Sequence, residues 1–294
     1  METYGSLDEF THRTSAVVSL GMFDGVHLAH REVLRTLTAR AQATGSRSVV
    51  ISFTPHPRTL LSGEPFPLIV TQAEKRWLLE KQQVDIWCRL PFTRELAATP
   101  PEALLQQLNS KMEIRHIVLG YNHNFGSHKS GDIHTLISLQ SEYGFGITEI
   151  PRIMSEGTEV SSSAIRAALL AGDVSTASRL LGYSYFAYIQ PVGQTDAGAM
   201  HACVPAEKLL PAPGNYNGHW NHSPVQITIL NQQEMLLRPD DGTPLPETPQ
   251  PLPLYWDSLL EKNKTHLSKS GPIPRKRSPT PSTGCSCHPV LSAP

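Results

Sequence analysis

The chain has 294 residues, 39% of them hydrophobic and 17% charged, and a formal net charge of −1 at pH 7. This length suffices for one large or two modest domains with a buried core, and so balanced a charge gives no reason to expect a nucleic-acid partner. No apolar stretch approaches the ~18 residues of a membrane span, and the acidic start is unlike a secretory signal peptide. Four thinly spread cysteines favour a reducing compartment. We therefore expect a cytoplasmic protein with no nucleic-acid or membrane partner, and the sequence leaves its oligomeric state open.

Residues 16–186 alternate short β-branched runs with segments of helical periodicity. In chain order, the expected strands are 16–20, 48–53, 85–90, 115–119 and 146–150. The expected helices are 30–44, 71–82, 101–109, 132–142, 162–171 and 174–181. This alternation predicts an α/β fold with a mostly parallel sheet covered on both faces. Because ligands of such sheets bind beyond the carboxyl ends of the strands, we expect loops 21–30, 54–58 and 120–129 to meet at one rim.

The sequence changes character after residue 186. The following stretch has strand-like pieces such as Val225–Leu230 but few helical patterns. Beyond residue 238 prolines become dense, and such a segment buries too little apolar surface to offset its chain entropy. We therefore expect an α/β domain over residues 1–186, a small β region over 187–238 and a mostly disordered tail over 239–294.

The segment G-M-F-D-G-V-H-L-A-H, residues 21–30, leaves the first strand through glycines and enters a helix. His27 and His30 are three residues apart, so we expect both imidazoles on one face of the first helical turn. The helix N-terminus adds partial positive charge and free N–H donors, which suits a triphosphate. Two alternatives stay open. In the first, Asp24 caps the helix and both histidines are ordinary surface residues. In the second, the histidines bind zinc, although no third ligand stands at metal spacing nearby.

The segment V-S-S-S-A-I-R, residues 160–166, places a run of hydroxyls at the start of another predicted helix. The hydroxyls can donate to phosphate oxygens, and Arg166 can stabilise charge as pyrophosphate departs. The alternative is a serine N-cap followed by a solvated arginine.

Two further polar segments follow strand ends. Residues 119–132, L-G-Y-N-H-N-F-G-S-H-K-S-G-D, form a glycine-studded loop in which the Asn122 amide can meet an adenine or flavin edge. In F-T-P-H-P-R, two prolines hold His56 rigidly and Arg58 can meet a phosphate. A plain surface loop and a structural turn remain the alternatives for these two segments.

These four segments, in this order, resemble the adenylyltransferase half of the bacterial bifunctional riboflavin kinase/FAD synthetase family over about residues 15–186. The resemblance implies a Rossmann-like nucleotidyltransferase domain that transfers AMP from ATP, with Mg²⁺, to FMN and releases FAD and pyrophosphate. It implies a catalytic group of His27, His30 and Arg166, and no protein ligands dedicated to a metal. It implies ATP contacts from Gly21, Phe23, Asp24, Gly25, Ser161, Ser162 and Ser163. It implies contacts with the flavin or substrate from His56, Pro57, Arg58, Asn122 and Phe125.

The sequence departs from the family pattern at several positions. Met22 stands where Asn is usual, Ala29 where Gly is usual, and His123–Asn124 where Phe-Arg is usual. Ser163 replaces the commoner threonine and keeps its hydroxyl. The altered loop leaves open adenylyl transfer to another phosphorylated acceptor, and a non-catalytic flavin- or nucleotide-binding module is a further alternative.

A β-barrel riboflavin kinase follows the transferase domain in that family. Residues 203–220 look like one piece of such a barrel, but residues 191–202 contain neither the glycine-rich stretch nor the P-T-A-N segment of the kinase. We therefore expect residues 187–238 to form a degenerate, shortened β-barrel-like remnant without riboflavin kinase activity.

Overall fold

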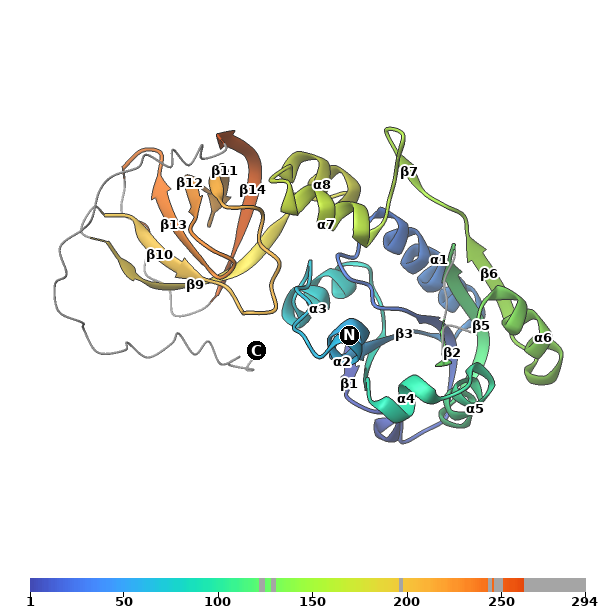
Figure 1. Ribbon diagram of the computed structural model, residues 1–294. Helices are drawn as coiled ribbons and strands as arrows, with labels where there is room; N and C mark the ends of the chain where they lie inside the picture. Colours follow the sequence, from blue (N-terminus) through green and yellow to red (C-terminus); the bar gives the residue numbers. More distant parts are fainter. Residues whose placement is uncertain (122–124, 128–130, 196–197, 243–244, 246–250, 262–294) are drawn as a thin grey trace, which may run out of the picture.

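The computed structural model describes residues 1–121, 125–127, 131–195, 198–242, 245 and 251–261. An α/β domain is followed by a β-barrel, and helices α7 (Ser162–Leu170) and α8 (Val174–Leu181) lie between the two (Figure 1). This architecture confirms the predicted fold class.

The α/β domain contains a six-stranded sheet in the order β1-β4-β3-β2-β5-β6, with every pairing parallel. Its strands are β1 (Glu2–Tyr4), β2 (Thr14–Leu20), β3 (Arg47–Thr54), β4 (Ile86–Pro91), β5 (Met112–Gly120) and β6 (Gly146–Ile150). Strand β1 was not predicted because three residues are too few to show a period. The chain runs from β2 to β3 on one side, whereas β5 lies on the other side of β2, so the strand order reverses beside β2.

The helices of this domain also follow the periodicity of the sequence. They are α1 (Leu28–Thr44), α2 (Pro57–Ser62), α3 (Gln72–Lys81), α4 (Arg94–Ala98), α5 (Pro101–Lys111) and α6 (Ile133–Tyr143), after a short 3-10 helix η1 (Leu7–Glu9). The helices α2 and α4 were not predicted, because fewer than two turns carry no readable apolar face.

The two faces of the sheet pack into two hydrophobic clusters. On one face Val17 and Val50 contact the buried side of α1, and this cluster continues through α7 and α8 into the barrel. On the other face Ala16 and Val18 pack with α5 and α6. Neighbouring residues of β2 therefore serve opposite cores, as the period of two in a strand requires.

The second domain is a closed barrel in the order β10-β13-β12-β11-β14-β9. Its strands are β9 (Phe186–Gln194), β10 (Met200–Cys203), β11 (Gly214–Trp220), β12 (Ser223–Ile229), β13 (Glu234–Pro239) and β14 (Leu252–Glu261). Tyr216, Trp220 and Trp256 are fully buried within it. A closed barrel of this kind agrees with the predicted β-barrel-like region.

The barrel extends past residue 238, where we predicted that it would end. Strand β14 lies inside the segment expected to be a tail, and it pairs with both β11 and β9 to close the barrel. Its Leu254 and Trp256 are buried two residues apart, a strand pattern that the surrounding prolines obscure in the sequence. Within the expected tail, residues 243–244, 246–250 and 262–294 lie outside the described residues.

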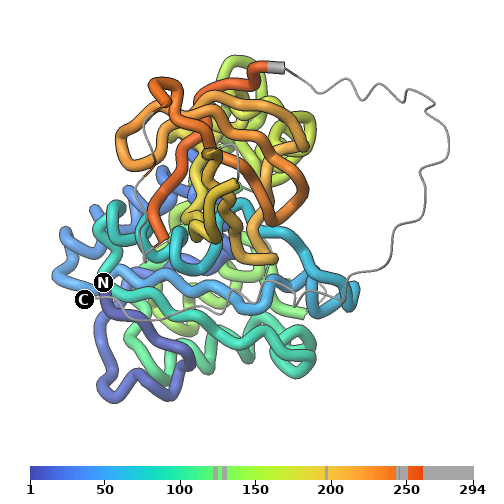
Figure 2. Tube along the Cα trace, turned by 90° about the vertical axis from the view of Figure 1, so that its left-hand side faces the viewer, coloured from blue at the N-terminus to red at the C-terminus, as the bar shows by residue number. Residues whose placement is uncertain are grey.

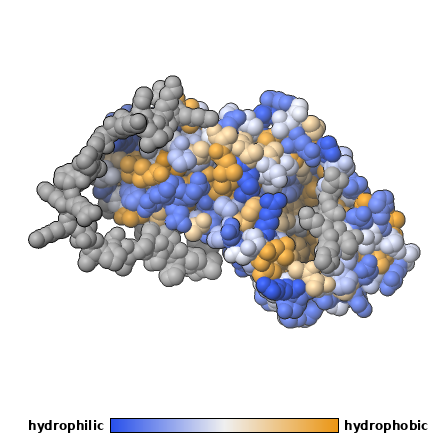
Figure 3. All heavy atoms as spheres, in the orientation of Figure 1, coloured by the Kyte–Doolittle hydropathy of each residue, from blue (hydrophilic) through white to orange (hydrophobic). Residues whose placement is uncertain are grey.

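The barrel lies over one side of the α/β domain (Figure 2). Phe186 at the start of β9 packs edge-on against Trp77 of α3, with 5.3 Å between ring centroids. On the face shown in Figure 3, hydrophilic and hydrophobic side chains are interspersed over both domains. None of the helices in the described part of the chain has the length and apolar character needed to cross a membrane.

Candidate active site

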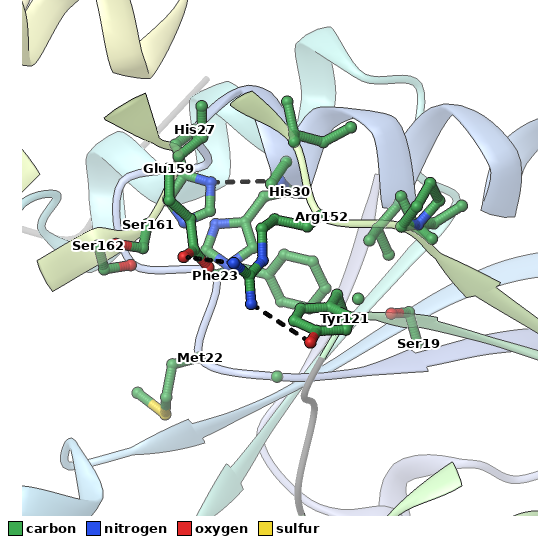
Figure 4. A pocket seen from close by; sticks show the side chains of 18 of the residues that line it. Ser19, Met22, Phe23, His27, His30, Tyr121, Arg152, Glu159, Ser161 and Ser162 are labelled. Atoms are coloured by element: carbon green, nitrogen blue, oxygen red, sulfur yellow. Dashed lines mark hydrogen bonds and ion pairs between the residues drawn. The ribbon is translucent and has the colours of Figure 1, made fainter. Parts of the chain in front are cut away.

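A pocket of about 360 Å³ opens at the carboxyl ends of β2 and β5 (Figure 4). Residues 19–22 and Gly120–Tyr121 supply its sheet side, α1 supplies one wall, and residues 150–153 and 159–162 supply the other. This is the place where the strand order reverses, which is where open α/β sheets bind their ligands. The pocket therefore unites segments 21–30 and 160–166 of the sequence.

His27 and His30 lie together at this pocket. His27 is the N-cap of α1, and its Nδ1 accepts a 3.3 Å hydrogen bond from the backbone N–H of His30. The two rings stack with 3.6 Å between centroids and 14° between planes. Because His27 is 5% exposed, burial lowers its pKa to about 4, and it is neutral at physiological pH. The cap is thus His27, and the alternative in which Asp24 caps the helix is wrong.

The turn before α1 needs an unusual backbone. Gly25 has a φ of 90°, and a Cβ there would lie 3.2 Å from Leu181 Cδ2. Phe23 also has a positive φ, of 47°, and its ring lies 5.0 Å from that of His30. Buried Lys75 donates a 2.7 Å hydrogen bond to the Met22 carbonyl, so the strained turn is held from α3. Gly21, Met22 and Phe23 line the pocket.

Two hydroxyls of the serine run line the same pocket. Ser161 caps α7 by accepting from the backbone N–H of Ala164, and Ser162 Oγ donates a 2.8 Å hydrogen bond to the Asp24 carbonyl. Ser163 is exposed and is not among the lining residues. The structure therefore brings two of the three predicted serines to the histidine pair.

Asp24 and Arg166 lie beside the pocket and contact each other. The Asp24 carboxylate accepts hydrogen bonds from the backbone N–H groups of Ile69 (2.9 Å) and Val70 (3.3 Å). It also accepts a 2.6 Å hydrogen bond from Arg166 Nη2, while Arg166 Nη1 donates to the Pro67 carbonyl. Neither residue lines the pocket. Asp24 thus joins the glycine turn to segment 67–70, and Arg166 reaches that junction from α7.

The Phe66 ring gathers residues from two of the predicted motifs. His56 lies 4.4 Å from it between ring centroids, and the guanidinium carbons of Arg166 and Arg58 lie 4.2 and 5.0 Å from its centroid. His56 caps α2, of which Pro57 is the first residue. Burial, with Arg166, Lys75 and Arg58 adding to it, lowers the pKa of His56 to about 4. We call these four side chains, His56, Arg58, Phe66 and Arg166, the Phe66 cluster.

Two predicted residues of loop 119–132 stand apart from this arrangement. Phe125 is 6% exposed and packs in the hydrophobic cluster of the opposite sheet face, outside the pocket. Asn122 lies outside the described residues, as do the altered positions His123 and Asn124.

Sequence reasoning missed a charged group at the pocket mouth. Arg152 Nη2 donates a 3.3 Å hydrogen bond to Tyr121 Oη, its guanidinium carbon lies 4.8 Å from the Tyr121 ring centroid, and Nη1 is 3.6 Å from Glu159 Oε2. Figure 4 shows Arg152 between these two partners. Among the described pocket-lining residues Arg152 is the only arginine or lysine. Arg152 precedes a hairpin of two-residue strands, β7 (Met154–Ser155) and β8 (Thr158–Glu159). Strands this short show no period in the sequence, so only the dipeptide Glu156-Gly157 indicates a turn there.

Fold and pocket together define a Rossmann-like nucleotidyltransferase. The histidine pair, of which His27 is neutral, lies at one helix N-terminus, serine hydroxyls lie at a second, and both face the pocket at the switch point of a parallel sheet. A family model described as FAD synthetase matches residues 9–164, and the chain belongs to the FAD synthetase family. The resemblance noted in the sequence is thereby confirmed.

Curated relatives agree with this family. An FAD synthetase from Listeria monocytogenes is 30% identical over 204 residues, which cover 69% of this chain and 80% of the relative. The bifunctional riboflavin kinase/FMN adenylyltransferases of the same bacterium and of Bacillus subtilis are 29% and 31% identical. Those matches cover 60% and 59% of this chain but only 57% and 55% of the relatives.

A solved structure shares the fold over both domains. The crystal structure titled as a macrolide-efflux protein from Streptococcus pneumoniae superposes with a TM-score of 0.73. It covers 90% of this chain and 93% of that one at 20% identity, so the likeness concerns the fold alone.

Proposed function

We propose that this chain is an FMN adenylyltransferase, which transfers AMP from ATP to FMN and releases FAD and pyrophosphate. The observation that carries the proposal is the union of His27 and His30 with Ser161 and Ser162 in one pocket, in a chain of the FAD synthetase family. The names of the relatives, which include FMN adenylyltransferase, support the choice of acceptor.

The pocket is proposed to hold ATP. Its histidine pair and the N-termini of α1 and α7 offer hydrogen-bond donors to the phosphates, with Gly21 and Phe23 shaping the wall and Gly25 the turn. Arg152 is proposed to add positive charge at the mouth, because the neutral His27 supplies none.

The Phe66 cluster is proposed to form the acceptor side. An aromatic ring flanked by two guanidinium groups suits a planar, anionic molecule such as FMN. Arg166 lies between the two sides, since it contacts both Phe66 and the turn residue Asp24. A guanidinium carries five N–H donors, so its bonds to Asp24 and Pro67 leave donors for a phosphate.

The main task of the protein in this reaction is to position the phosphates of ATP and FMN. A phosphate oxygen of FMN is already anionic at neutral pH, so it attacks the α-phosphorus of ATP in line without a general base. The new P–O bond forms as the bond from the α-phosphorus to the bridging oxygen breaks, and pyrophosphate leaves with that electron pair. The histidines and Arg166 hold the phosphates as charge shifts between them.

Mg²⁺ is proposed to arrive with ATP. Among the described residues no group of three His, Cys, Asp or Glu side chains is placed to bind a metal ion. The pocket does offer the hydroxyl oxygens of Ser161 and Ser162, which are hard donors that fit an ion held mainly by triphosphate and water. When bound, the ion would neutralise phosphate charge.

We further propose that residues 1–186 carry the transferase and that the barrel has no riboflavin kinase activity. Residues 191–202 lack the expected glycine-rich and P-T-A-N segments.

One pair of assays tests both parts. The purified protein is incubated with ATP, Mg²⁺ and FMN, and FAD and pyrophosphate are followed; equimolar formation of both is expected. In the second assay riboflavin replaces FMN, and no FMN or FAD should appear. Absence of FAD from the first assay, with pyrophosphate released only on another phosphorylated acceptor, would overturn the choice of FMN. FMN formation from riboflavin would overturn the loss of the kinase.

A further inference from the structure

A fully buried ion pair joins the barrel domain to α3. Lys208, between β10 and β11, places Nζ 2.7 Å from Glu74 Oε2, and both side chains are 0% exposed. The same Nζ donates to the carbonyls of Ile69 (2.7 Å) and Phe186 (2.8 Å). The three protons of the ammonium group therefore all have acceptors. Burying two charges is costly even when they pair, so the ion pair itself adds little to the free energy of unfolding. The importance of Lys208 therefore lies in the backbone segments that it binds.

Both carboxylate oxygens of Glu74 are also held by backbone N–H groups. Its Oε2 accepts from the backbone N–H of Thr71, completing a capping box at the start of α3, and its Oε1 accepts from the N–H of Tyr188 in β9. The carboxylate thus contacts both domains, which places the pair at their common boundary.

The hydrogen bonds continue from this pair to the proposed site. Ile69 accepts from Lys208 through its carbonyl and donates through its N–H to Asp24 Oδ1 at 2.9 Å. Asp24 Oδ2 in turn accepts from Arg166 at 2.6 Å, and the Asp24 carbonyl accepts from Ser162. Ile69 and Asp24 therefore connect Lys208 of the barrel domain to Arg166 and Ser162 of α7.

Backbone pairing strengthens the same link. Leu68 donates a 2.6 Å hydrogen bond to the Glu207 carbonyl and accepts one of 2.8 Å from Leu209, a parallel β-bridge between the domains. The next residues towards the N-terminus are Pro67, which accepts from Arg166, and Phe66, on which Arg166 stacks. Segment 66–70 is thus held by the barrel on one side and contacts Arg166 and Asp24 on the other.

We propose that the barrel is a brace for the transferase site, in which Lys208 positions segment 66–70 and thereby Asp24, Phe66 and Arg166. The inference rests on the proposed function for the role of Arg166. In this proposal the barrel supports adenylyl transfer without catalysing any reaction itself. Lys208 is a positioning residue, because it acts through Ile69 and touches no substrate.

The test must separate positioning from stability. Lys208→Met alone leaves Glu74 buried without its partner, which can unfold the protein. The double variant Lys208→Met/Glu74→Gln removes both charges while the amide oxygen keeps an acceptor in place. Tyr216→Phe is the matched control, because it removes a barrel hydrogen bond to the Ala212 carbonyl that lies outside the network. The full-length chain is used throughout.

Each variant is assayed for FAD formation with ATP and FMN, for thermal midpoint and for amide hydrogen exchange. In the double variant we expect kcat to fall at least tenfold with KM for ATP within about twofold, because the His27 ring accepts its hydrogen bond from the backbone N–H of His30 and not from segment 66–70. Exchange at the Ile69 and Val70 amides, which donate to Asp24, should accelerate at least tenfold. Tyr216→Phe should change neither quantity.

Wild-type kcat and wild-type exchange at Ile69 and Val70 in the double variant would overturn the brace. A fall in kcat that tracks the thermal midpoint equally in the double variant and in Tyr216→Phe would also overturn it. The exchange measurement needs no turnover, so it decides the brace even if the wild-type protein makes no FAD, a result that counts against the proposed function alone.

Discussion

Arg166 Nη2 donates a 2.6 Å hydrogen bond to Asp24 Oδ2, joining α7 to the turn after β2 across 142 positions of sequence. The pair is largely buried, with the Asp24 side chain 4% and that of Arg166 15% exposed. Burial raises the pKa of Asp24, while Lys75 and Arg166 oppose that rise. The contact couples the two motifs on which the proposed function depends.

We expect Arg166→Lys to lower kcat for FAD formation by about 10- to 100-fold while the protein stays folded. Lysine can pair with Asp24, but it has neither the planar fork that also reaches Pro67 nor the flat face that stacks on Phe66. Steady-state kinetics with circular dichroism checks this. Arg35→Lys, at an exposed ion pair with Glu32, is the control, and an Arg166→Lys enzyme as active as that control would contradict the role.

We expect His27→Asn to reduce turnover by on the order of 10²–10³, the usual cost of losing one such phosphate contact. Asparagine is a good N-cap, so the start of α1 is kept while the imidazole stacked on His30 is lost. The measurement is kcat with saturating ATP and FMN. Thr93→Asn, at the N-cap of the distant α4, should be neutral, and an active His27→Asn enzyme would leave His27 with a capping role only.

We expect Arg152→Met to raise KM for ATP roughly tenfold with little change in kcat. A hydrogen bond to a charged group contributes about 1.5–3 kcal/mol, and Arg152 is the only arginine or lysine among the described lining residues. Glu159→Gln should shift KM the opposite way, since it removes the negative partner 3.6 Å from Arg152. Arg115→Met, at an exposed ion pair with Glu113, is the control. Unchanged KM values in both pocket variants would place Arg152 outside nucleotide binding.

We expect replacement of Ser19 to increase the stability of the protein but to weaken ATP binding. Ser19 is 1% exposed and lines the pocket, and its buried hydroxyl finds no hydrogen-bond partner among the residues that the structure describes. Ser19→Ala should therefore stabilise the ligand-free protein by about 1 kcal/mol, because a buried unsatisfied group is removed, and should raise KM for ATP severalfold. Denaturant unfolding and kinetics measure the two effects. A destabilised variant with unchanged KM would show that the hydroxyl serves the fold.

The buried His27 should make stability depend on pH. Its folded-state pKa, about 4, lies below the ordinary value of 6.5, so between these values the unfolded chain binds the extra proton. The contribution is complete above pH 6.5 and is lost as pH falls towards 4, by about 3 kcal/mol for such a shift. Unfolding free energies of wild type and His27→Asn at pH 4.5–7 should show a shallower slope for the variant. Parallel curves would mean that His27 titrates normally in the folded protein.

Local patterns in the sequence were enough for most of the α/β domain. The helix expected over 174–181 is α8 with the same bounds, and the strand expected over 146–150 is β6. Each depends on periodicity within one element and on end residues such as Gly182. The same local reading found the glycine turn, the histidine pair and the serine run.

Tertiary structure alone decided how those pieces act on one another. The sequence did not indicate that Asp24 would bind segment 67–70, that Phe66 would gather His56, Arg58 and Arg166, or that Arg152 would reach the pocket mouth. The Lys208–Glu74 pair spans 134 positions. Periodicity reports only which side of its own helix or strand a residue occupies. A contact between residues far apart in the sequence depends instead on how separately formed elements pack against each other. Burial adds a second condition, because a buried charge is costly unless the fold places an oppositely charged or hydrogen-bonding partner beside it.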